Sequence, residues 1–134
     1  MRRESTQLLS TLALAKTPSS RLVAYNSNNL AGGGCQDDDC GLTSFGRRII
    51  DEMADCGMIV CCSHAGYRTA REVIDCSANP VIFSHSNPRA LRDHARNIPD
   101  DLMRACAARG WVIGINGIDL FLDENRPMSR HIRL

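Results

Sequence analysis

Short apolar runs recur along the chain, and each ends at polar or turn-forming residues. The clearest are MIVCC at 58–62 and VIFS at 81–84. Runs of this length that stay apolar throughout are typical of strands covered on both faces of a sheet. With the runs LVAY and WVIGI, the pattern predicts four strands, at 22–25, 58–62, 81–84 and 111–115.

The segments between these runs carry apolar residues at helical spacing and have recognisable ends. Thr43 is a suitable N-cap and Gly57 a suitable stop for the first helix, and Pro99 with the two acids after it opens a later one. A short helix is expected to open at Asn87. Helices are therefore predicted at 44–56, 67–76, from 87 onward, at 99–109 and in the last stretch, 123–134.

Strands that alternate with helices at this spacing predict an α/β fold made of parallel β/α units with right-handed crossovers. Four such strands fit either an open sheet or part of a (β/α)8 TIM-like barrel. In both architectures ligands bind at the carboxyl ends of the strands, where the loops converge. Candidate functional residues are therefore those that directly follow the apolar runs.

Composition and charge narrow the classes of function. The chain has 134 residues, enough for one domain with a real core, and 43% hydrophobic with 23% charged residues is typical of a soluble globular protein. A formal net charge of +1 gives no reason to expect nucleic acid as a partner. Because no apolar run reaches the roughly 20 residues that cross a bilayer, we expect no membrane span.

The cysteines and the N-terminus bear on location. The 7 cysteines are an odd number scattered mainly through apolar segments, which favours reduced thiols in a cytoplasmic protein over a disulfide framework. Residues 1–20 contain two arginines and a short apolar stretch, so a secreted or periplasmic location is the alternative. Glu4 and the interrupting Ser10 and Thr11 weaken that signal.

Two histidines occupy equivalent places on consecutive β/α units. His64 and His85 each come directly after a serine, close to the end of an apolar run. Adjacent parallel strands lie about 4.8 Å apart, so two imidazoles at their carboxyl ends can reach one zinc ion with bonds of about 2.1 Å. The alternative is a pair of histidines that are hydrogen-bonded in the core or at its rim. The equivalence of the two positions favours zinc.

Longer motifs around these histidines resemble a known enzyme family. The chain is similar to the membrane (renal) dipeptidase family of zinc metallopeptidases, peptidase family M19, and to its bacterial members. The resemblance lies in YNSNNLAGGGC, GLTSFGRRIIDEMADCGMIVCCSH, PVIFSHSNPRALRDHARNIPDDL and VIGING, between residues 22 and 122. It implies a (β/α)8 barrel that hydrolyses dipeptides at a two-zinc site bridged by a carboxylate.

The resemblance also implies roles for single residues. His64 and His85 match the histidines that bind one of the zinc ions. Arg96, which precedes Asn-Ile-Pro-Asp, matches the arginine that holds the substrate's carboxylate. Tyr25 stands where the family has a substrate-contacting histidine, or tyrosine in many bacterial members. Because a dipeptide is about 7 Å long, we expect the Arg96 guanidinium about 6–10 Å from the histidine nitrogens. Without the match, Arg96 would be interpreted as a solvated surface charge.

Other features of the family are not matched. No His-x-Asp precedes Tyr25, and neither the bridging glutamate nor a late aspartate for proton transfer has a counterpart. Cys61 stands where many members have an aspartate, which we expect to change how His64 is oriented. We therefore interpret residues 22–134 as a partial dipeptidase barrel, truncated at both ends, and residues 1–21 as an N-terminal segment that does not resemble the family.

This set of residues leaves two functions open. The first is a zinc-dependent dipeptidase-type hydrolase, with dipeptides as substrates, present as an incomplete chain. The alternative is an inactive remnant that binds metal or serves as an interaction module. The chain by itself is expected to be inactive, because catalytic zinc usually takes three protein ligands. The open edges of a partial barrel predict a homo-oligomer or aggregation.

Overall fold

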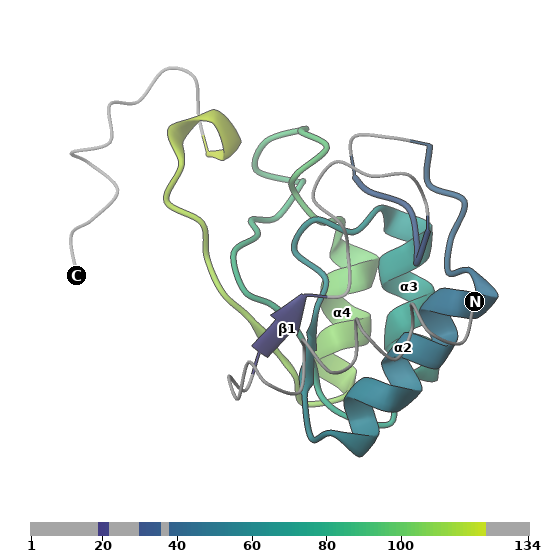
Figure 1. The fold of residues 1–134 in the computed structure, drawn as a ribbon. Coiled ribbons are helices and arrows are strands. Elements are labelled where there is room, and N and C mark those ends of the chain that lie inside the picture. The colour runs from purple at the N-terminus through teal and green to yellow at the C-terminus, as the bar shows by residue number, and fades with distance from the viewer. Residues whose placement is uncertain (1–18, 22–29, 36–37, 123–134) are drawn as a thin grey trace.

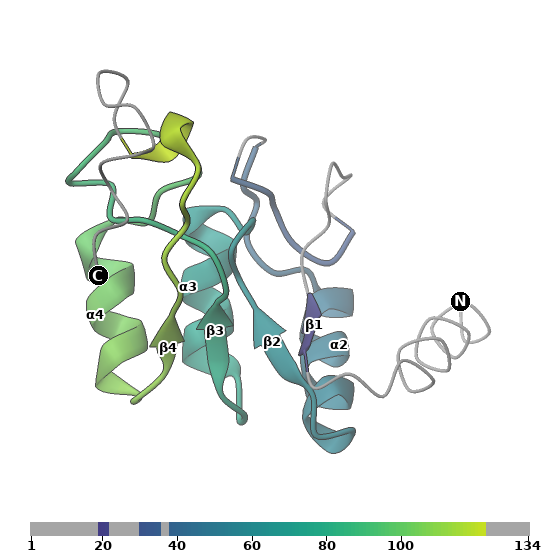
Figure 2. The same ribbon diagram turned by 90° about the vertical axis from the view of Figure 1, so that its left-hand side faces the viewer.

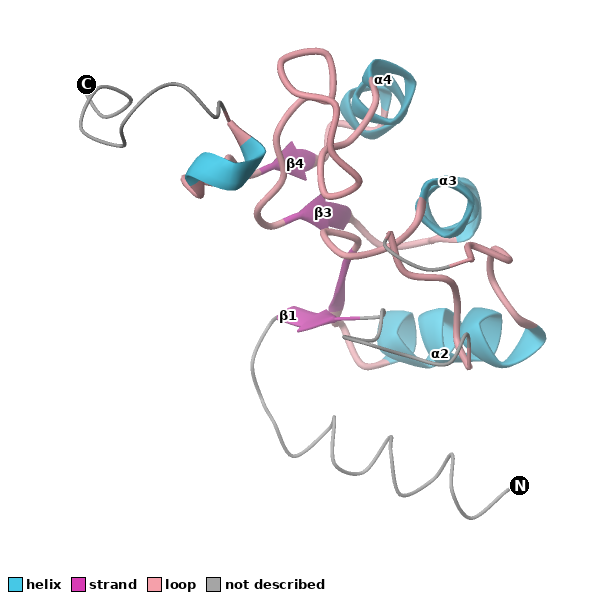
Figure 3. Cartoon of the chain, turned by 90° about the horizontal axis from the view of Figure 1, so that it is seen from above, coloured by secondary structure: helices cyan, strands magenta, loops and turns pink. Residues whose placement is uncertain are grey.

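The computed structural model describes residues 19–21, 30–35 and 38–122, which form a parallel sheet with helices packed on it (Figure 1). The elements in chain order are β1 (Ser19–Arg21), α2 (Ser44–Asp55), β2 (Ile59–Cys61), α3 (Tyr67–Cys76), β3 (Val81–Phe83), α4 (Asp100–Ala108), β4 (Val112–Ile113) and the 3-10 turn η1 (Asp119–Phe121). The described sheet has the strand order β1-β2-β3-β4. The three α-helices lie on the same side of it (Figure 2 and Figure 3).

The parallel register places the carboxyl ends of neighbouring strands at one edge of the sheet. Cys61 at the end of β2 pairs with Ile82, and Phe83 at the end of β3 pairs with Ile113. Helices α2, α3 and α4 lie in the connections between consecutive strands. The prediction of parallel β/α units is therefore confirmed, and the loops that follow β2, β3 and β4 share one edge.

The helix ends follow local signals in the sequence. Helix α2 begins after Thr43, whose hydroxyl accepts a hydrogen bond from the Gly46 N–H at 3.0 Å. It stops before Gly57, where φ is +69°, a left-handed conformation that glycine adopts without a steric penalty. Helix α3 has the predicted bounds. Helix α4 starts at Asp100 with Pro99 as its N-cap, one residue later than predicted.

The strands are shorter than the apolar runs that predict them. Strands β2, β3 and β4 each lie inside a predicted run. The predicted strand at 22–25 and the predicted helix at 123–134 lie outside the described residues. Strand β1 ends at Arg21, directly before the predicted strand at 22–25. None of the described helices is long and apolar enough to cross a membrane.

The predicted short helix that opens at Asn87 is wrong. The segment between β3 and α4 forms turns instead. Two backbone hydrogen bonds close it, from the Ile98 N–H to the Asn87 carbonyl at 2.9 Å and from the Arg89 N–H to the Ile98 carbonyl at 2.8 Å. These long-range bonds use main-chain groups that a helix would pair locally, so tertiary contacts override the local preference.

The hydrophobic core lies between the sheet and its helices. Alternate residues of β2 and β3 point into it, and Val60, Val81 and Phe83 are each at most 1% exposed. The helices contribute Ile50, Met53, Ala70, Val73, Ile74, Leu102 and Cys106. None of the described helices covers the opposite face of the sheet (Figure 2), where Ile82 is half-buried and Val112 is 64% exposed.

The end of the described sheet at β4 is both apolar and open. Gly114 donates its N–H to the Phe83 carbonyl at 2.6 Å, so Gly114 pairs with β3. Main-chain groups alternate in direction along a parallel strand, so those of Ile113 and Ile115 point away from β3, toward the open edge. More than half of each of four apolar residues there is exposed: Val112, Ile115, Ile118 and Leu120. An open strand edge beside apolar surface favours pairing with another chain.

We therefore expect the chain to self-associate with a second copy along the β4 edge. Sedimentation velocity over a range of concentrations should show the weight-average mass rising with concentration. Ile115→Lys should shift the protein toward monomer, because a lysine at a paired edge must be desolvated. Leu91→Lys is the control: Leu91 is 72% exposed but lies in the loop after β3, so its replacement should leave association unchanged. A monomer at every concentration would contradict the prediction.

A side chain from a distant loop caps the N-terminus of α3. The N-cap residue is Gly66, which has no side chain to do so. The Asp39 carboxylate instead accepts hydrogen bonds from the N–H groups of Arg68 and Thr69 and, at 2.6 Å, from the Thr69 hydroxyl. The Thr69 hydroxyl oxygen accepts a further hydrogen bond from the Gly33 N–H at 2.8 Å. The loop that precedes α2 is thereby tied to α3.

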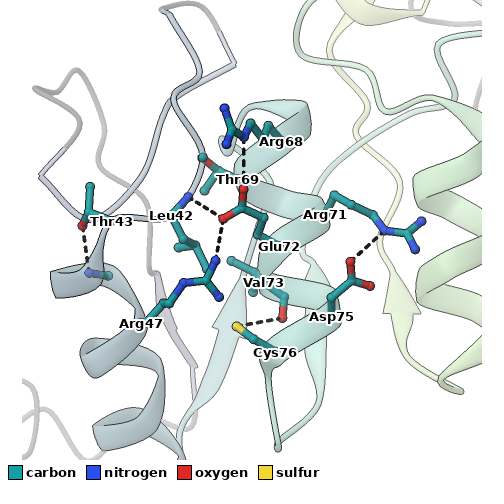
Figure 4. A network of polar contacts seen from close by, with 12 residues as sticks. Leu42, Thr43, Arg47, Arg68, Thr69, Arg71, Glu72, Val73, Asp75 and Cys76 are labelled. Carbon is teal, nitrogen blue, oxygen red and sulfur yellow. Dashed lines mark hydrogen bonds and ion pairs between the residues drawn. The ribbon is translucent and has the colours of Figure 1, made fainter.

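Glu72 connects the same segments one turn further along α3 (Figure 4). Its carboxylate accepts hydrogen bonds from the Leu42 N–H at 3.1 Å, from Arg47 at 2.8 Å and from Arg68 at 3.1 Å. Individual ion pairs at a surface contribute only about 0–1 kcal/mol. Here one carboxylate joins the loop, α2 and α3, so its effect is to hold three segments in register.

Candidate metal centre

His64 and His85 meet at the carboxyl ends of β2 and β3. Their Nε2 atoms are 3.1 Å apart, and the ring centroids are 5.1 Å apart at an interplanar angle of 61°. The main-chain N–H of His85 donates to the Ser63 hydroxyl at 3.0 Å, which fixes the two segments against each other. Both histidines therefore present the same ring nitrogen to one point. Their role as metal ligands stays a prediction.

The spacing of the two nitrogens suits a shared zinc ion. Two ligands in a tetrahedral zinc site with Zn–N bonds of about 2.1 Å lie about 3.4 Å from each other. The observed 3.1 Å differs from that value by an amount that a small ring rotation can supply. Within the described ranges, no cluster of three or more His, Cys, Asp or Glu residues could hold a metal. The described residues thus fit a zinc ion as two of its ligands.

Arg96 lies beside the histidine pair and is only 6% exposed. Its Nη1 group donates to the Ser63 carbonyl, and its Nη2 group is 3.2 Å from Nε2 of His64. Its Cζ atom is 5.5 Å from the centre of the Phe121 ring. In the part of the chain that the structure describes, no carboxylate forms an ion pair with it. The described partners of this buried guanidinium thus include a carbonyl, an imidazole and an aromatic ring.

The guanidinium is closer to the histidines than the length of a dipeptide predicts. The sequence-based expectation was about 6–10 Å, whereas the Arg96 side chain folds onto the Ser63 carbonyl and reaches His64 at 3.2 Å. Two like unit charges about 4 Å apart repel by about 4 kcal/mol at an effective dielectric constant of about 20. The positive charge of Arg96 therefore disfavours a cation on the histidine pair while the guanidinium stays at this distance.

Buried asparagines hold the loops on either side of this site. The Asn97 amide donates to the carbonyls of Arg92 at 3.0 Å and Phe121 at 2.8 Å. Asn87 and Asn116 bond reciprocally: the Asn87 amide donates to the Asn116 carbonyl at 2.9 Å, and the Asn116 N–H donates to the Asn87 side-chain oxygen at 3.0 Å. Asn87 and Asn97 are each 1% exposed. The loop after β3 is thus fixed to the segment after β4.

The side chains of Cys61, Ser63 and Ser84 form a small polar cluster beside His85. The Ser84 hydroxyl oxygen is 2.7 Å from Nδ1 of His85, 3.1 Å from the Cys61 sulfur and 3.2 Å from the Ser63 hydroxyl oxygen. Burial would raise the pKa of the Cys61 thiol, but the hydrogen bonds to Ser84 and Ser63 outweigh it, so this pKa lies below its ordinary value. The sequence-based prediction did not include the two serines, although the serine before each histidine was a signal for them.

The structure brings together three of the four residues to which a site role was assigned from the sequence. His64, His85 and Arg96 lie at one edge of the sheet, with His64 within hydrogen-bond distance of both His85 and Arg96. Tyr25 lies outside the described residues. Cys61, which was expected to affect His64, contacts Ser63, the residue before His64, and Ser84, the residue before His85.

The histidines and Arg96 thus lie at the carboxyl ends of parallel strands, where enzymes built on β/α barrels have their active sites. The family model for membrane dipeptidase (peptidase family M19) matches residues 6–131, and the chain belongs to this family. Its homologues include dipeptidases and metallopeptidases.

Two solved structures share the fold, and their barrels contain this sheet as a part. An amidohydrolase from Pseudomonas aeruginosa is 34% identical with a TM-score of 0.78, over 84% of this chain and 35% of that one. The probable dipeptidase PvdM from the same organism is 26% identical with a TM-score of 0.79, over 87% of this chain and 31% of that one. Dipeptidase 3 of Rattus norvegicus is 38% identical over 73 residues, 54% of this chain and 15% of the relative. The chain thus spans about a third or less of the proteins it matches.

Proposed function

We propose that this chain carries the two-histidine part of a zinc centre in a dipeptidase-type hydrolase, which cleaves the peptide bond of dipeptides. The observation that carries the proposal is the 3.1 Å approach of the two Nε2 atoms at the carboxyl ends of adjacent parallel strands. Membership of the membrane dipeptidase family supports the reaction type. Two neutral imidazoles are ligands that zinc prefers.

The chemistry of such a site divides between the metal and the chain. Bound zinc supplies a Lewis acid for the scissile carbonyl and lowers the pKa of water to near neutrality. His64 and His85 hold the metal through Nε2. Arg96 binds the free carboxylate of the dipeptide, which selects short substrates with an exposed C-terminus. Tyr25, outside the described residues, is proposed as a second substrate contact.

The decisive measurement is dipeptide hydrolysis by the purified chain with and without zinc. Free amino acids released from a panel of dipeptides should disappear on chelation and return with zinc if the chain is a self-sufficient dipeptidase. Zinc binding without hydrolysis would support the second candidate, a metal-binding remnant that is catalytically inactive. The two-ligand cluster favours this second outcome for the chain by itself, because catalytic zinc usually takes three protein ligands. Absence of zinc binding would refute both.

The role of Arg96 predicts a preference for free carboxylates. The zinc-loaded chain should bind a dipeptide about tenfold more tightly than the matching dipeptide amide, since a hydrogen bond to a charged group contributes about 1.5–3 kcal/mol. Arg96→Ala should remove this preference without weakening zinc binding, as measured by isothermal titration calorimetry, because arginine is not a zinc ligand. Arg104→Ala is the control: this arginine is exposed on α4 and pairs with Asp100. An Arg96→Ala protein that still prefers the carboxylate would contradict the assignment.

A further inference from the structure

His85 is held at two points by neighbouring serines. The Ser84 hydroxyl contacts its ring at Nδ1, at 2.7 Å, and the Ser63 hydroxyl accepts its main-chain N–H at 3.0 Å. Ser84 in turn lies 3.1 Å from the Cys61 sulfur and 3.2 Å from the Ser63 hydroxyl oxygen. Cys61 is 5% exposed and Ser63 is 3% exposed, so the two groups that Ser84 contacts besides His85 are buried in the protein. The His85 ring has Nδ1 at Ser84 and Nε2 at His64.

The chemistry of Arg96 decides where the protons lie when no metal is bound. A guanidinium has only donors, so Nε2 of His64, 3.2 Å from Nη2, is the acceptor in that contact. The other contact of the same nitrogen, to Nε2 of His85 at 3.1 Å, then needs His85 as the donor. A neutral His85 that carries its proton on Nε2 has an acceptor at Nδ1. The Ser84 hydroxyl therefore donates to His85 without metal.

Metal binding through Nε2 of His85 requires the opposite tautomer. The lone pair must then be on Nε2 and the proton on Nδ1, which becomes a donor. The Ser84 oxygen, 2.7 Å away, accepts this hydrogen bond, and its own proton turns toward the Cys61 sulfur or the Ser63 oxygen. A hydroxyl can both donate and accept, so one side chain serves both states without moving a heavy atom.

We propose that Ser84 is a positioning residue for the metal site. Its hydroxyl can either donate a hydrogen bond to Nδ1 of His85 or accept one from it, so His85 can change tautomer and present its Nε2 lone pair to a zinc ion. The proposal rests on the proposed zinc site at the two histidines. Ser63 and Cys61 complete this arrangement, because the Ser63 oxygen or the Cys61 sulfur accepts the hydrogen bond of the Ser84 hydroxyl when that hydroxyl turns away from His85. Groups that support a metal-bound histidine in this way typically change metal affinity by about 10–100-fold.

A pair of nearly isosteric variants tests the hydroxyl. Ser84 is an exposed position, so in Ser84→Ala a water molecule could replace the lost group. Ser84→Val fills that space without a hydroxyl, and Ser84→Thr has the same shape with one. Isothermal titration calorimetry with zinc should show about tenfold weaker binding for Ser84→Val than for Ser84→Thr, which should stay close to the unmodified protein. Equal zinc affinities for the two variants would overturn the proposal.

Nitrogen-15 NMR of the histidine rings reads the tautomer directly, and it separates this proposal from the zinc site itself. In the metal-free protein, His85 should carry its proton on Nε2, and its Nδ1 should accept a hydrogen bond. The same hydrogen bond should be present in Ser84→Thr and absent in Ser84→Val. Zinc should move the proton to Nδ1. If zinc binds nowhere, the proposed function fails, and the metal-free spectra still decide the role of Ser84. An Nδ1 resonance that is the same in Ser84→Val and Ser84→Thr would refute that role.

Discussion

Replacing His85 with alanine should weaken zinc binding by roughly 100-fold or more. Structural zinc sites with four ligands bind with about 10–16 kcal/mol, or about 2.5–4 kcal/mol for each ligand, and this range corresponds to about 100- to 1,000-fold in affinity. The two Nε2 atoms lie 3.1 Å apart, so loss of either ring removes half of the described donor set. His64→Ala should have an effect of the same size. Isothermal titration calorimetry of both variants measures it.

The matched control for these variants is His94→Ala. His94 lies in the same loop as Arg96, where its Nδ1 accepts a hydrogen bond from the Arg96 main-chain N–H at 3.0 Å. Its ring is tilted by 52° to that of Phe121, with the ring centroids 4.8 Å apart. It is not part of the pair, so its loss should leave zinc affinity within about twofold of the unmodified protein, well below the effect of a lost ligand. A site that tolerates His85→Ala but not His94→Ala would show that the metal binds elsewhere.

Replacing Asp39 with alanine should lower the free energy of unfolding by about 2–3 kcal/mol. The Asp39 carboxylate caps the first turn of α3 through the N–H groups of Arg68 and Thr69, and it also accepts from the Thr69 hydroxyl and, at 3.2 Å, the Gly41 N–H. Loss of a cap costs about 1 kcal/mol, and a lost hydrogen bond to a charged acceptor about 1.5–3 kcal/mol. Urea unfolding followed by circular dichroism gives the change from the transition midpoint.

Two further variants show whether the carboxylate is responsible. Asp38→Ala removes the exposed acid next to it and should change the free energy of unfolding by less than about 0.5 kcal/mol, as most surface substitutions do. Asp39→Asn keeps one oxygen acceptor without the charge, so its stability should fall between those of the alanine variant and the unmodified protein. If Asp39→Ala were as stable as Asp38→Ala, the cap would contribute nothing to the fold.

Several elements of the fold could be predicted because their signals are local. Thr43 caps α2 through the N–H of Gly46, and Gly57 ends it in a left-handed conformation, all within one turn of the helix ends. The apolar runs before His64 and His85 likewise contain the strands β2 and β3. Equivalent positions on consecutive parallel strands then predicted that the two histidines would meet.

The remainder of the site could not be predicted because its partners are far apart in the sequence. The loop from Asn87 to Ile98 has a helix-like start, yet its main-chain groups pair across the loop. The guanidinium of Arg96 turns onto the Ser63 carbonyl, a choice that depends on where the loop after β3 passes the end of β2. Ser84 reaches Cys61 only because β2 and β3 are neighbours.

The sequence by itself determined the alternation of strands and helices, most helix ends, and which residues follow the carboxyl ends of the strands. These features depend on side-chain periodicity and on capping groups within a few residues. The tertiary structure decided the cap that Asp39 places on α3, the approach of Arg96 to His64, and the contacts of Ser84 with Cys61 and Ser63. Each of these joins residues more than 20 positions apart, so it exists only after the parallel register has brought the loops to one edge of the sheet.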